Sequence, residues 1–129
     1  MLRRTLVAGS VVALATAAGA SAASPGLYMG KTSQKQTISV QVTGGKVVKV
    51  VYFAKYGACG DFSGQDKVAI TIKNNKFSAT VHPNSETVDQ VSGTFKGKAV
   101  SGTLSSTVIT GGLHGSVCHS GKLKFSAKL

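Results

Sequence analysis

Residues 122–129 read Lys-Leu-Lys-Phe-Ser-Ala-Lys-Leu, and polar and apolar side chains alternate along this stretch without a break. Successive side chains of a β-strand point to opposite faces, so the pattern predicts a strand with one face in a core and the other in water. The predicted core face carries Leu123, Phe125, Ala127 and Leu129. Similar alternation recurs along the chain, and no segment after the first 22 residues shows the apolar period of a helix. The chain is therefore predicted to be all-β.

Seven earlier segments carry the same signal, and turn residues between several of them favour hairpins. These predicted strands are residues 26–32, 37–42, 47–54, 67–73, 77–81, 91–95 and 100–104. Asn74 and Asn75 stand where a tight turn needs positive φ, and Gly93 and Gly102 relieve crowding or permit sharp bending in the last pair. About eight strands in hairpin order predict a single antiparallel β-barrel or β-sandwich with a meander-like topology, and the alternation leaves both open.

The first 22 residues have the composition of a secretory signal peptide. Arg3 and Arg4 precede an apolar run, and Ala20-Ser21-Ala22 supplies the small residues that a signal peptidase recognises. We therefore expect residues 1–22 to be removed and residues 23–129 to form one secreted β-domain. Residues 23–129 contain no apolar run near the ~20 residues of a transmembrane helix, so we expect no membrane anchor in the mature form.

The sequence contains two cysteines, Cys59 and Cys118. In an exported chain, two cysteines favour one internal disulfide with no thiol left over. They lie in two glycine-rich stretches, 57–64 and 111–121, which lack steady alternation. We expect these stretches to be the two longest loops, and the disulfide to tie either the loops or their flanking strands together. The loops are the best candidates for a functional surface.

Lysine dominates the charge of the chain. The formal net charge is +11, and it falls to +9 when Arg3 and Arg4 leave with the signal peptide. Thirteen lysines against four acidic residues would attract polyanions, and salt would screen that attraction. Arginine is preferred for bidentate base recognition, so a domain whose basic residues are all lysine is not expected to read nucleic acid specifically. Outward lysines also improve solubility and protect sheet edges, and both interpretations remain open.

Two kinds of residue form the candidate binding surface. Its lysines are predicted to point outward, and its aromatic residues flank Cys59 in sequence. The residues are Lys73, Lys122, Lys124, Lys128, Tyr56 and Phe62. The phenylalanines on predicted core faces are interpreted as packing residues, and these are Phe77, Phe95 and Phe125.

No catalytic or metal-binding motif rises above background. The four acidic residues, Asp61, Asp66, Glu86 and Asp89, have no spacing that identifies a glycosidase pair, and no serine lies in Gly-x-Ser-x-Gly. The spacing of the three histidines, His82, His114 and His119, matches no zinc signature, so no metal and no cofactor is expected. A hydrolase that uses His114, His119 and Asp61 is the least favoured hypothesis.

Several short strings together resemble a family of small secreted β-domains found in actinobacterial hypothetical proteins. The strings are Gly26-Leu-Tyr-Met-Gly30-Lys-Thr-Ser-Gln34, residues 38–42, Gly93-Thr-Phe95, Cys118-x-Ser120-Gly121 and Phe125-x-Ala127. The resemblance spans most of residues 23–129, and it implies export and an all-β fold without an activity.

The sequence thus predicts a secreted, non-catalytic β-domain. Its lysine excess favours electrostatic association with anionic polymers of the cell envelope. The alternative is an extracellular protein-binding or inhibitor module that presents the segments around Cys59 and Cys118 to a protein partner.

Overall fold

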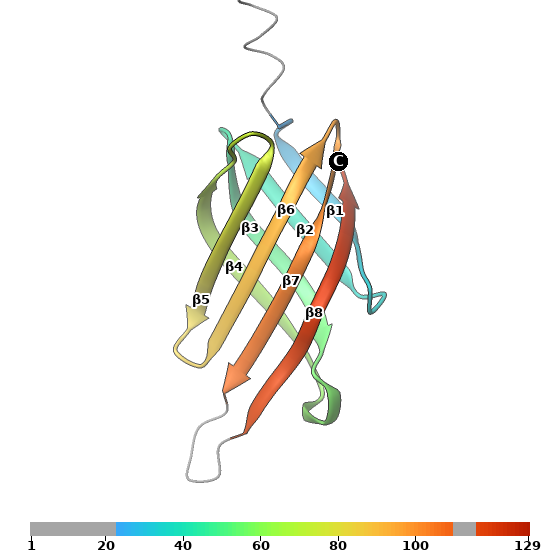
Figure 1. Ribbon diagram of the computed structural model, residues 1–129, viewed down its shortest axis with the longest axis vertical. Helices are drawn as coiled ribbons and strands as arrows, with labels where there is room; N and C mark the ends of the chain where they lie inside the picture. Colours follow the sequence, from blue (N-terminus) through green and yellow to red (C-terminus); the bar gives the residue numbers. More distant parts are fainter. Residues whose placement is uncertain (1–22, 110–115) are drawn as a thin grey trace, which may run out of the picture.

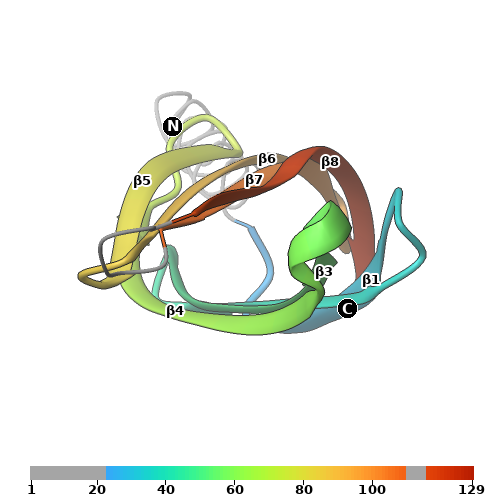
Figure 2. The same ribbon diagram turned by 90° about the horizontal axis from the view of Figure 1, so that it is seen from below.

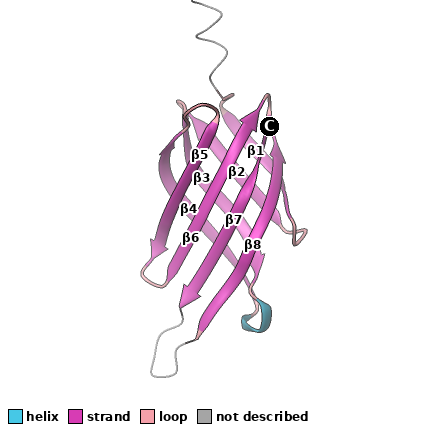
Figure 3. Cartoon of the chain, in the orientation of Figure 1, coloured by secondary structure: helices cyan, strands magenta, loops and turns pink. Residues whose placement is uncertain are grey.

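A computed structural model of the protein describes residues 23–109 and 116–129. The predicted signal peptide, residues 1–22, and His114 lie outside the described residues. Nearly all of the described chain is strand (Figure 3). The strands are β1 (Gly26–Thr32), β2 (Thr37–Thr43), β3 (Lys46–Lys55), β4 (Asp61–Thr71), β5 (Lys76–Asn84), β6 (Thr87–Lys96), β7 (Ala99–Ile109) and β8 (Val117–Lys128). A single 3-10 turn, η1 (Gly57–Cys59), connects β3 to β4.

The eight strands form one antiparallel sheet in the order β4-β3-β2-β1-β8-β7-β6-β5. Strands that are consecutive in the chain lie side by side in the sheet, as in a meander, except that β4 and β5 are its two edges. Strand β1 pairs with β8 as well as with β2. Because the first and last strands are hydrogen-bonded, the sheet curls into a nearly closed barrel, seen from the side in Figure 1 and end-on in Figure 2. The predicted all-β fold of about eight strands is confirmed, and its architecture is a barrel.

The seam of the barrel lies between β4 and β5, which are the two edges of the sheet. Asn74 and Asn75 have φ of 54° and 61°, so the predicted tight turn is present. The isolated bridge between Lys73 and Lys76 is the only β-pairing that joins the two sides among the described residues. The hairpin expected between residues 67–73 and 77–81 therefore does not continue as a ladder beyond this bridge: β4 pairs with β3, and β5 pairs with β6.

The inward faces of the strands fill the barrel with one core. On β8 the predicted alternation is confirmed, since Leu123, Phe125 and Ala127 are at most 4% exposed. Leu129 differs because it follows the last residue of β8, and it is 45% exposed beside Gly26. Phe77 and Phe95 are also buried, in agreement with their predicted packing role, and their ring centroids are 5.7 Å apart. The core face of β8 was therefore readable from its alternation.

Gly93 and Gly102 face each other across β6 and β7. A Cβ atom at Gly102 would overlap the carbonyl oxygen of Ser92 and would lie 2.6 Å from the Cα of Gly93. The prediction that these glycines relieve crowding is confirmed, because the two backbones approach too closely for a side chain.

The two glycine-rich stretches are shorter as loops than predicted. Residues 61–64 belong to β4 and pair with β3. Residues 117–121 belong to β8, where 117–119 pair with β7 and 120–121 lie at a register shift. Backbone hydrogen bonds extend these ladders without needing side-chain alternation, which is why the sequence pattern missed them. Within the described part of the chain, no helix is long and apolar enough to cross a membrane.

Candidate functional site

The predicted disulfide is present and defines one end of the barrel. Cys59 in η1 and Cys118 near the start of β8 are bonded, with their Cα atoms 6.1 Å apart. We call the end of the barrel that carries η1 and the β5–β6 turn the disulfide end (Figure 1). The bond fastens the β3–β4 connection to the last strand, so it holds the residues that follow β3 over the interior at this end.

A buried polar cluster lies inside the barrel near the disulfide end, and we call it the interior cluster. Its members come from β3, β4, β6, β7 and the residue that precedes η1, and each is at most 3% exposed. They are Tyr52, Tyr56, Asp66, Asp89 and Ser106. Buried polar groups require hydrogen-bond partners, so the contacts within the cluster determine what it can do.

Hydroxyl groups connect the members of the interior cluster. The Tyr52 hydroxyl donates to Oδ2 of Asp89 at 2.6 Å and lies 3.1 Å from Oγ of Ser106. The Tyr56 hydroxyl donates to the same Ser106 oxygen at 2.7 Å, and the Ser106 amide donates to Oγ of Ser120 at 2.9 Å. These contacts bring four strands together at one point in the barrel interior.

Asp66 and Asp89 form a carboxyl pair without a basic partner. Burial, followed by a hydrogen bond with Asp89 and the charge of Asp89, raises the pKa of Asp66 to about 8. Apart from this mutual contact, neither Asp66 oxygen nor Oδ1 of Asp89 has a hydrogen-bond partner among the described residues. Asp66 therefore keeps its proton near neutral pH and can donate it to Asp89.

Tyr52 remains a hydrogen-bond donor to this pair. Burial, and then its hydrogen bond with Asp89, raise the pKa of Tyr52 far above its ordinary value. The phenol consequently keeps its proton and donates it to Oδ2 of Asp89.

A cavity of about 340 Å³ opens beside the interior cluster at the disulfide end. Tyr52, Tyr56 and Phe62 line one part of it, and the rings of Tyr56 and Phe62 meet edge to face at 5.3 Å. Phe62 is 43% exposed, whereas Tyr56 is 3% exposed. Of the two predicted aromatic residues, Phe62 is therefore accessible and Tyr56 is buried, because Tyr56 continues the inward series of Tyr52 and Ala54.

The structure separates the predicted lysines from the two aromatic residues. Lys122, Lys124 and Lys128 are exposed on β8, and Lys73 lies in the turn that joins β4 and β5. None of these lysines lines the cavity that holds Tyr56 and Phe62. The single surface predicted from the sequence is thus two separate regions, an outer lysine-bearing face and an aromatic cavity.

The outer lysines border a hydroxyl-rich face formed by β5, β6, β7 and β8. Strand register arranges its outward side chains in three rows across the sheet. The rows are Lys76-Thr94-Ser101-Ser126, Ser78-Ser92-Thr103-Lys124 and Thr80-Gln90-Ser105-Lys122. We call these twelve residues the outer hydroxyl face. Each row ends at a lysine, and none of the twelve side chains is acidic.

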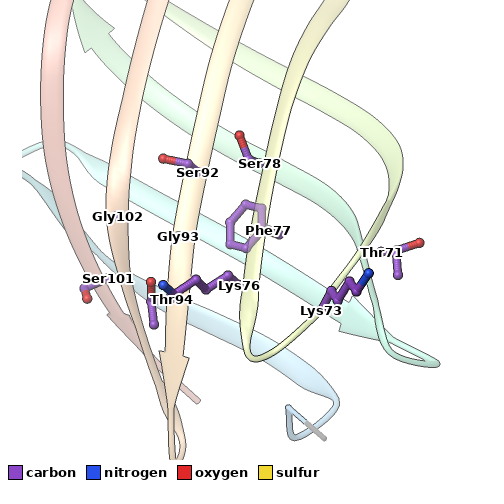
Figure 4. A pocket seen from close by; sticks show the side chains of 10 residues that line it. All are labelled: Thr71, Lys73, Lys76, Phe77, Ser78, Ser92, Gly93, Thr94, Ser101 and Gly102. Atoms are coloured by element: carbon purple, nitrogen blue, oxygen red, sulfur yellow. The ribbon is translucent and has the colours of Figure 1, made fainter. Parts of the chain in front are cut away.

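Two adjoining hollows mark the outer hydroxyl face. One has a volume of about 500 Å³ and the other about 460 Å³, and Ser78 and Ser92 line both. In Figure 4 the side chain of Lys76 extends over the first hollow toward Thr94, while Lys73 and Thr71 lie at its other side. The hollows exist because the outward side chains between the lysines are small, and lysines lie at the borders of both hollows.

No sequence motif identified Asp66 and Asp89 as functional residues. Their positions in the alternation were readable, because Asp66 has the same parity as Val68, and Asp89 the same parity as Val91. That parity indicates inward carboxyl groups. Their approach to each other was not readable, since it depends on how β4 and β6 meet across the barrel.

The residues of the hydrolase hypothesis do not form a described site. His119 is exposed on β8, with Nδ1 3.1 Å from Oγ1 of Thr107, and Asp61 is exposed at the start of β4. His82 is exposed on β5. Across the described ranges 23–109 and 116–129, no group of three or more His, Cys, Asp or Glu side chains could hold a metal ion.

Comparison with known proteins shows no relative: no family, no curated protein and no solved structure matches the chain.

Proposed function

We propose that this protein is a secreted, non-catalytic β-domain that adsorbs to anionic polymers of the cell envelope through the outer hydroxyl face. The observation that carries the proposal is the register of β5–β8, which gives three rows of hydroxyl and amide side chains that each end at a lysine. The signal-peptide pattern of residues 1–22 and the disulfide between Cys59 and Cys118 support export.

The chemistry of the outer hydroxyl face suits an extended, charged glycan or polyol polymer. Lysine ammonium groups attract phosphate or carboxylate groups, and serine, threonine and glutamine side chains both donate to and accept from polymer hydroxyls. Neighbouring strands lie about 4.8 Å apart, so a polymer that crosses from β5 to β8 would contact the face over about 14 Å. The two adjoining hollows give such a polymer a continuous depression to follow.

Two triple variants with the same change in charge test this proposal. The first, Lys76→Gln/Lys122→Gln/Lys124→Gln, removes the lysines of the outer hydroxyl face. The matched control, Lys46→Gln/Lys55→Gln/Lys67→Gln, removes three exposed lysines from β3 and β4. We expect the first variant to lose about tenfold or more of its affinity for purified cell walls, and the control to lose about twofold at most.

Two further measurements vary the salt concentration and the content of anionic polymer in the cell walls. Adsorption of the natural protein should weaken as the salt concentration rises, and it should fall when anionic polymers are stripped from the walls. Equal losses in the two triple variants would show that net charge alone, and not the outer hydroxyl face, governs adsorption. Binding that is insensitive to salt would contradict the proposal as a whole.

A protein-binding module is the second candidate, and the apolar side chains of the disulfide end favour it. Phe62, Ile109 and Val117 are 43%, 49% and 55% exposed, and Ile109 pairs with Val117 across β7 and β8. This candidate predicts salt-resistant capture of one defined extracellular protein, and Ile109→Ser/Val117→Ser should abolish that capture. Persistent capture by this variant would contradict it.

A further inference from the structure

Two rows of the outer hydroxyl face end at a hollow between β1 and β8, which lie side by side in the sheet (Figure 1). We call it the junction hollow, and its volume is about 240 Å³. Its buried lining residues are Thr32 and Phe125. Its exposed lining residues, the ones open to a ligand, are Lys31, Ser33, Lys124 and Ser126. The first row of the face ends at Ser126 and the second at Lys124.

Strand register places the four exposed side chains at the corners of a quadrilateral. Lys31 pairs with Ser126, and two residues further along, Ser33 lies opposite Lys124. Adjacent strands are about 4.8 Å apart and alternate residues of a strand about 6.8 Å apart, so the two lysines occupy diagonal corners. Diagonal cross-strand neighbours are about 7–8 Å apart. An oxyanion between Lys31 and Lys124 can therefore contact both ammonium groups at once.

Hydrogen bonds hold the turn after β1 in place without a ligand. The Ser33 amide donates to the Lys124 carbonyl at 2.7 Å, and Oγ of Ser33 accepts from the Lys124 amide at 3.2 Å. The hydroxyl proton of Ser33 takes no part in this contact, so it can be directed to a ligand. Gln34 fastens the same turn to β3, because its side-chain amide bonds to both backbone groups of Lys55, at 2.9 and 2.8 Å. The junction hollow is therefore preorganised, which lowers the cost of ordering it on binding.

No acidic residue neutralises the lysines of the junction hollow from the paired positions. The outward neighbour of Lys31 on β2 is Thr37, and the neighbour of Lys124 on β7 is Thr103. Ser126 pairs with Ser101, and the described lining contains no carboxylate. Two like charges at this separation repel each other, and an anion between them replaces repulsion with attraction.

We propose that the junction hollow binds a phosphate group of a polyol phosphate polymer. The site rests on the proposed function and deepens it, because a polymer that follows the first two rows arrives at this hollow. Lys31 and Lys124 contact the charged oxygens, and the hydroxyls of Ser33 and Ser126 donate to them. Lysine binds phosphate as a point charge, and a tetrahedral group presents its oxygens in several directions. Donors at four corners therefore suit phosphate better than a planar carboxylate.

The surroundings of the junction hollow favour a polyol phosphate over single-stranded nucleic acid, which carries the same phosphodiester group. Proteins that bind single strands stack the bases on exposed aromatic rings. Of the described residues that line the hollow, only Phe125 is aromatic, and it is 4% exposed. The rows that lead to the hollow carry hydroxyl and amide side chains, which pair with the hydroxyls of a polyol.

Titration with poly(glycerol phosphate), followed by the NMR shifts of the backbone amides, tests this assignment. Polygalacturonate is the carboxylate counterpart, oligothymidylate is the nucleic-acid counterpart, and inorganic phosphate is the free form of the group. All four probes are compared at equal ionic strength. We expect poly(glycerol phosphate) to bind about fivefold or more tightly than each of the other three probes. Its saturable shifts should include Lys31, Ser33, Lys124 and Ser126.

A double variant separates the junction hollow from general charge. Lys31→Gln/Ser33→Ala removes the β1 side of the hollow and leaves all twelve residues of the outer hydroxyl face in place. The matched control, Lys67→Gln/Ser63→Ala, makes the same chemical changes at exposed positions of β4. We expect about a fivefold loss of affinity for poly(glycerol phosphate) in the first variant and about twofold at most in the control. Lys31→Gln alone, which keeps both bonds between Ser33 and β8, should lose about threefold.

Three results would overturn the assignment. Equal affinity for poly(glycerol phosphate) and polygalacturonate would show no preference for phosphate, and tighter binding of oligothymidylate would assign the hollow to nucleic acid. Equal losses in the two double variants would show that net charge alone governs binding.

The junction hollow and the proposed function can fail separately. Full affinity of Lys31→Gln/Ser33→Ala for poly(glycerol phosphate), with adsorption to cell walls that still weakens in salt, would refute the hollow alone. Adsorption to cell walls that is insensitive to salt, with saturable shifts at the four corner residues in soluble poly(glycerol phosphate), would refute the proposed function and support the hollow.

Discussion

The hydroxyl of Tyr52 donates a 2.6 Å hydrogen bond to Oδ2 of Asp89, although 37 residues separate the two in the chain. Tyr52 comes from β3 and Asp89 from β6, so the bond spans the barrel interior and joins strands that are not neighbours in the sheet. Both partners are buried, so neither can replace this bond with one to water. This contact therefore organises both the carboxyl pair and the wall of the cavity.

Tyr52→Phe removes that donor and leaves the Asp89 oxygen without its hydroxyl partner. We expect a loss of about 1–3 kcal/mol in the free energy of unfolding, measured by urea denaturation, because an unsatisfied buried acceptor is destabilising. Tyr28→Phe is the matched control, since its hydroxyl donates at 2.7 Å to the Ser24 carbonyl, a neutral acceptor outside the strands. A larger loss in the control than in Tyr52→Phe would contradict this interpretation of the interior cluster.

The raised pKa of Asp66 predicts how stability depends on pH. The folded protein holds a proton on Asp66 up to about pH 8, whereas the unfolded chain releases it near its ordinary pKa of 3.8. Because the folded state binds more protons between these values, the contribution of Asp66 to stability falls as pH rises through this window and levels off above it. The natural protein should therefore lose stability toward alkaline pH relative to a variant that cannot ionise here.

Asp66→Asn is that variant, because its amide stays neutral and can still donate to Asp89. The difference in unfolding free energy between Asp66→Asn and the natural protein should grow in favour of the variant from about pH 4 to about pH 8. Denaturation curves over this range give the difference directly and cancel the other titrating groups. A difference that stays constant with pH would mean that Asp66 ionises normally in the fold.

Reduction of the disulfide should destabilise the barrel substantially. Cys59 and Cys118 are 59 residues apart, and the chain-entropy model assigns about 4 kcal/mol to closing a loop of this size. The variant Cys59→Ala/Cys118→Ala should unfold at the same lowered denaturant concentration as the reduced natural protein. If reduction leaves the midpoint of unfolding unchanged, the disulfide contributes no net stability.

Gly102→Ala places a methyl group where β6 and β7 approach most closely. Its Cβ would overlap the Ser92 carbonyl, and the obstacle is backbone that cannot rotate away, so we expect a loss of about 1–3 kcal/mol. Ser101→Ala, on the exposed side of the same strand, should stay within about 0.5 kcal/mol of the natural protein. The midpoints of thermal unfolding of the two variants provide the comparison. Equal midpoints would contradict the close approach of the β6 and β7 backbones at Gly102.

Local pattern was sufficient to locate the eight strands, although not their full lengths, and to identify the buried face of the last one. The alternation of Leu123, Phe125 and Ala127 with lysine and serine identified the last strand and its buried side, because side-chain direction in a strand has a period of two residues. The pairing of Cys59 with Cys118 followed from their number and from the signal-peptide pattern. Asp66 and Asp89 also have the parity of inward residues, but no sequence motif identified them as a site.

Tertiary structure alone decided which residues meet. Alternation is a local property, whereas the bonding of β1 to β8, the open seam between β4 and β5, and the shear of the barrel depend on pairings between distant segments. Those pairings brought Asp66 to Asp89, turned Tyr56 toward the interior cluster and aligned Lys122 and Lys124 with the hydroxyl rows of the neighbouring strands. The sequence by itself therefore determined where the strands lie, the buried face of the last one and the disulfide, and only closure of the sheet into a barrel created the cavity and the outer hydroxyl face.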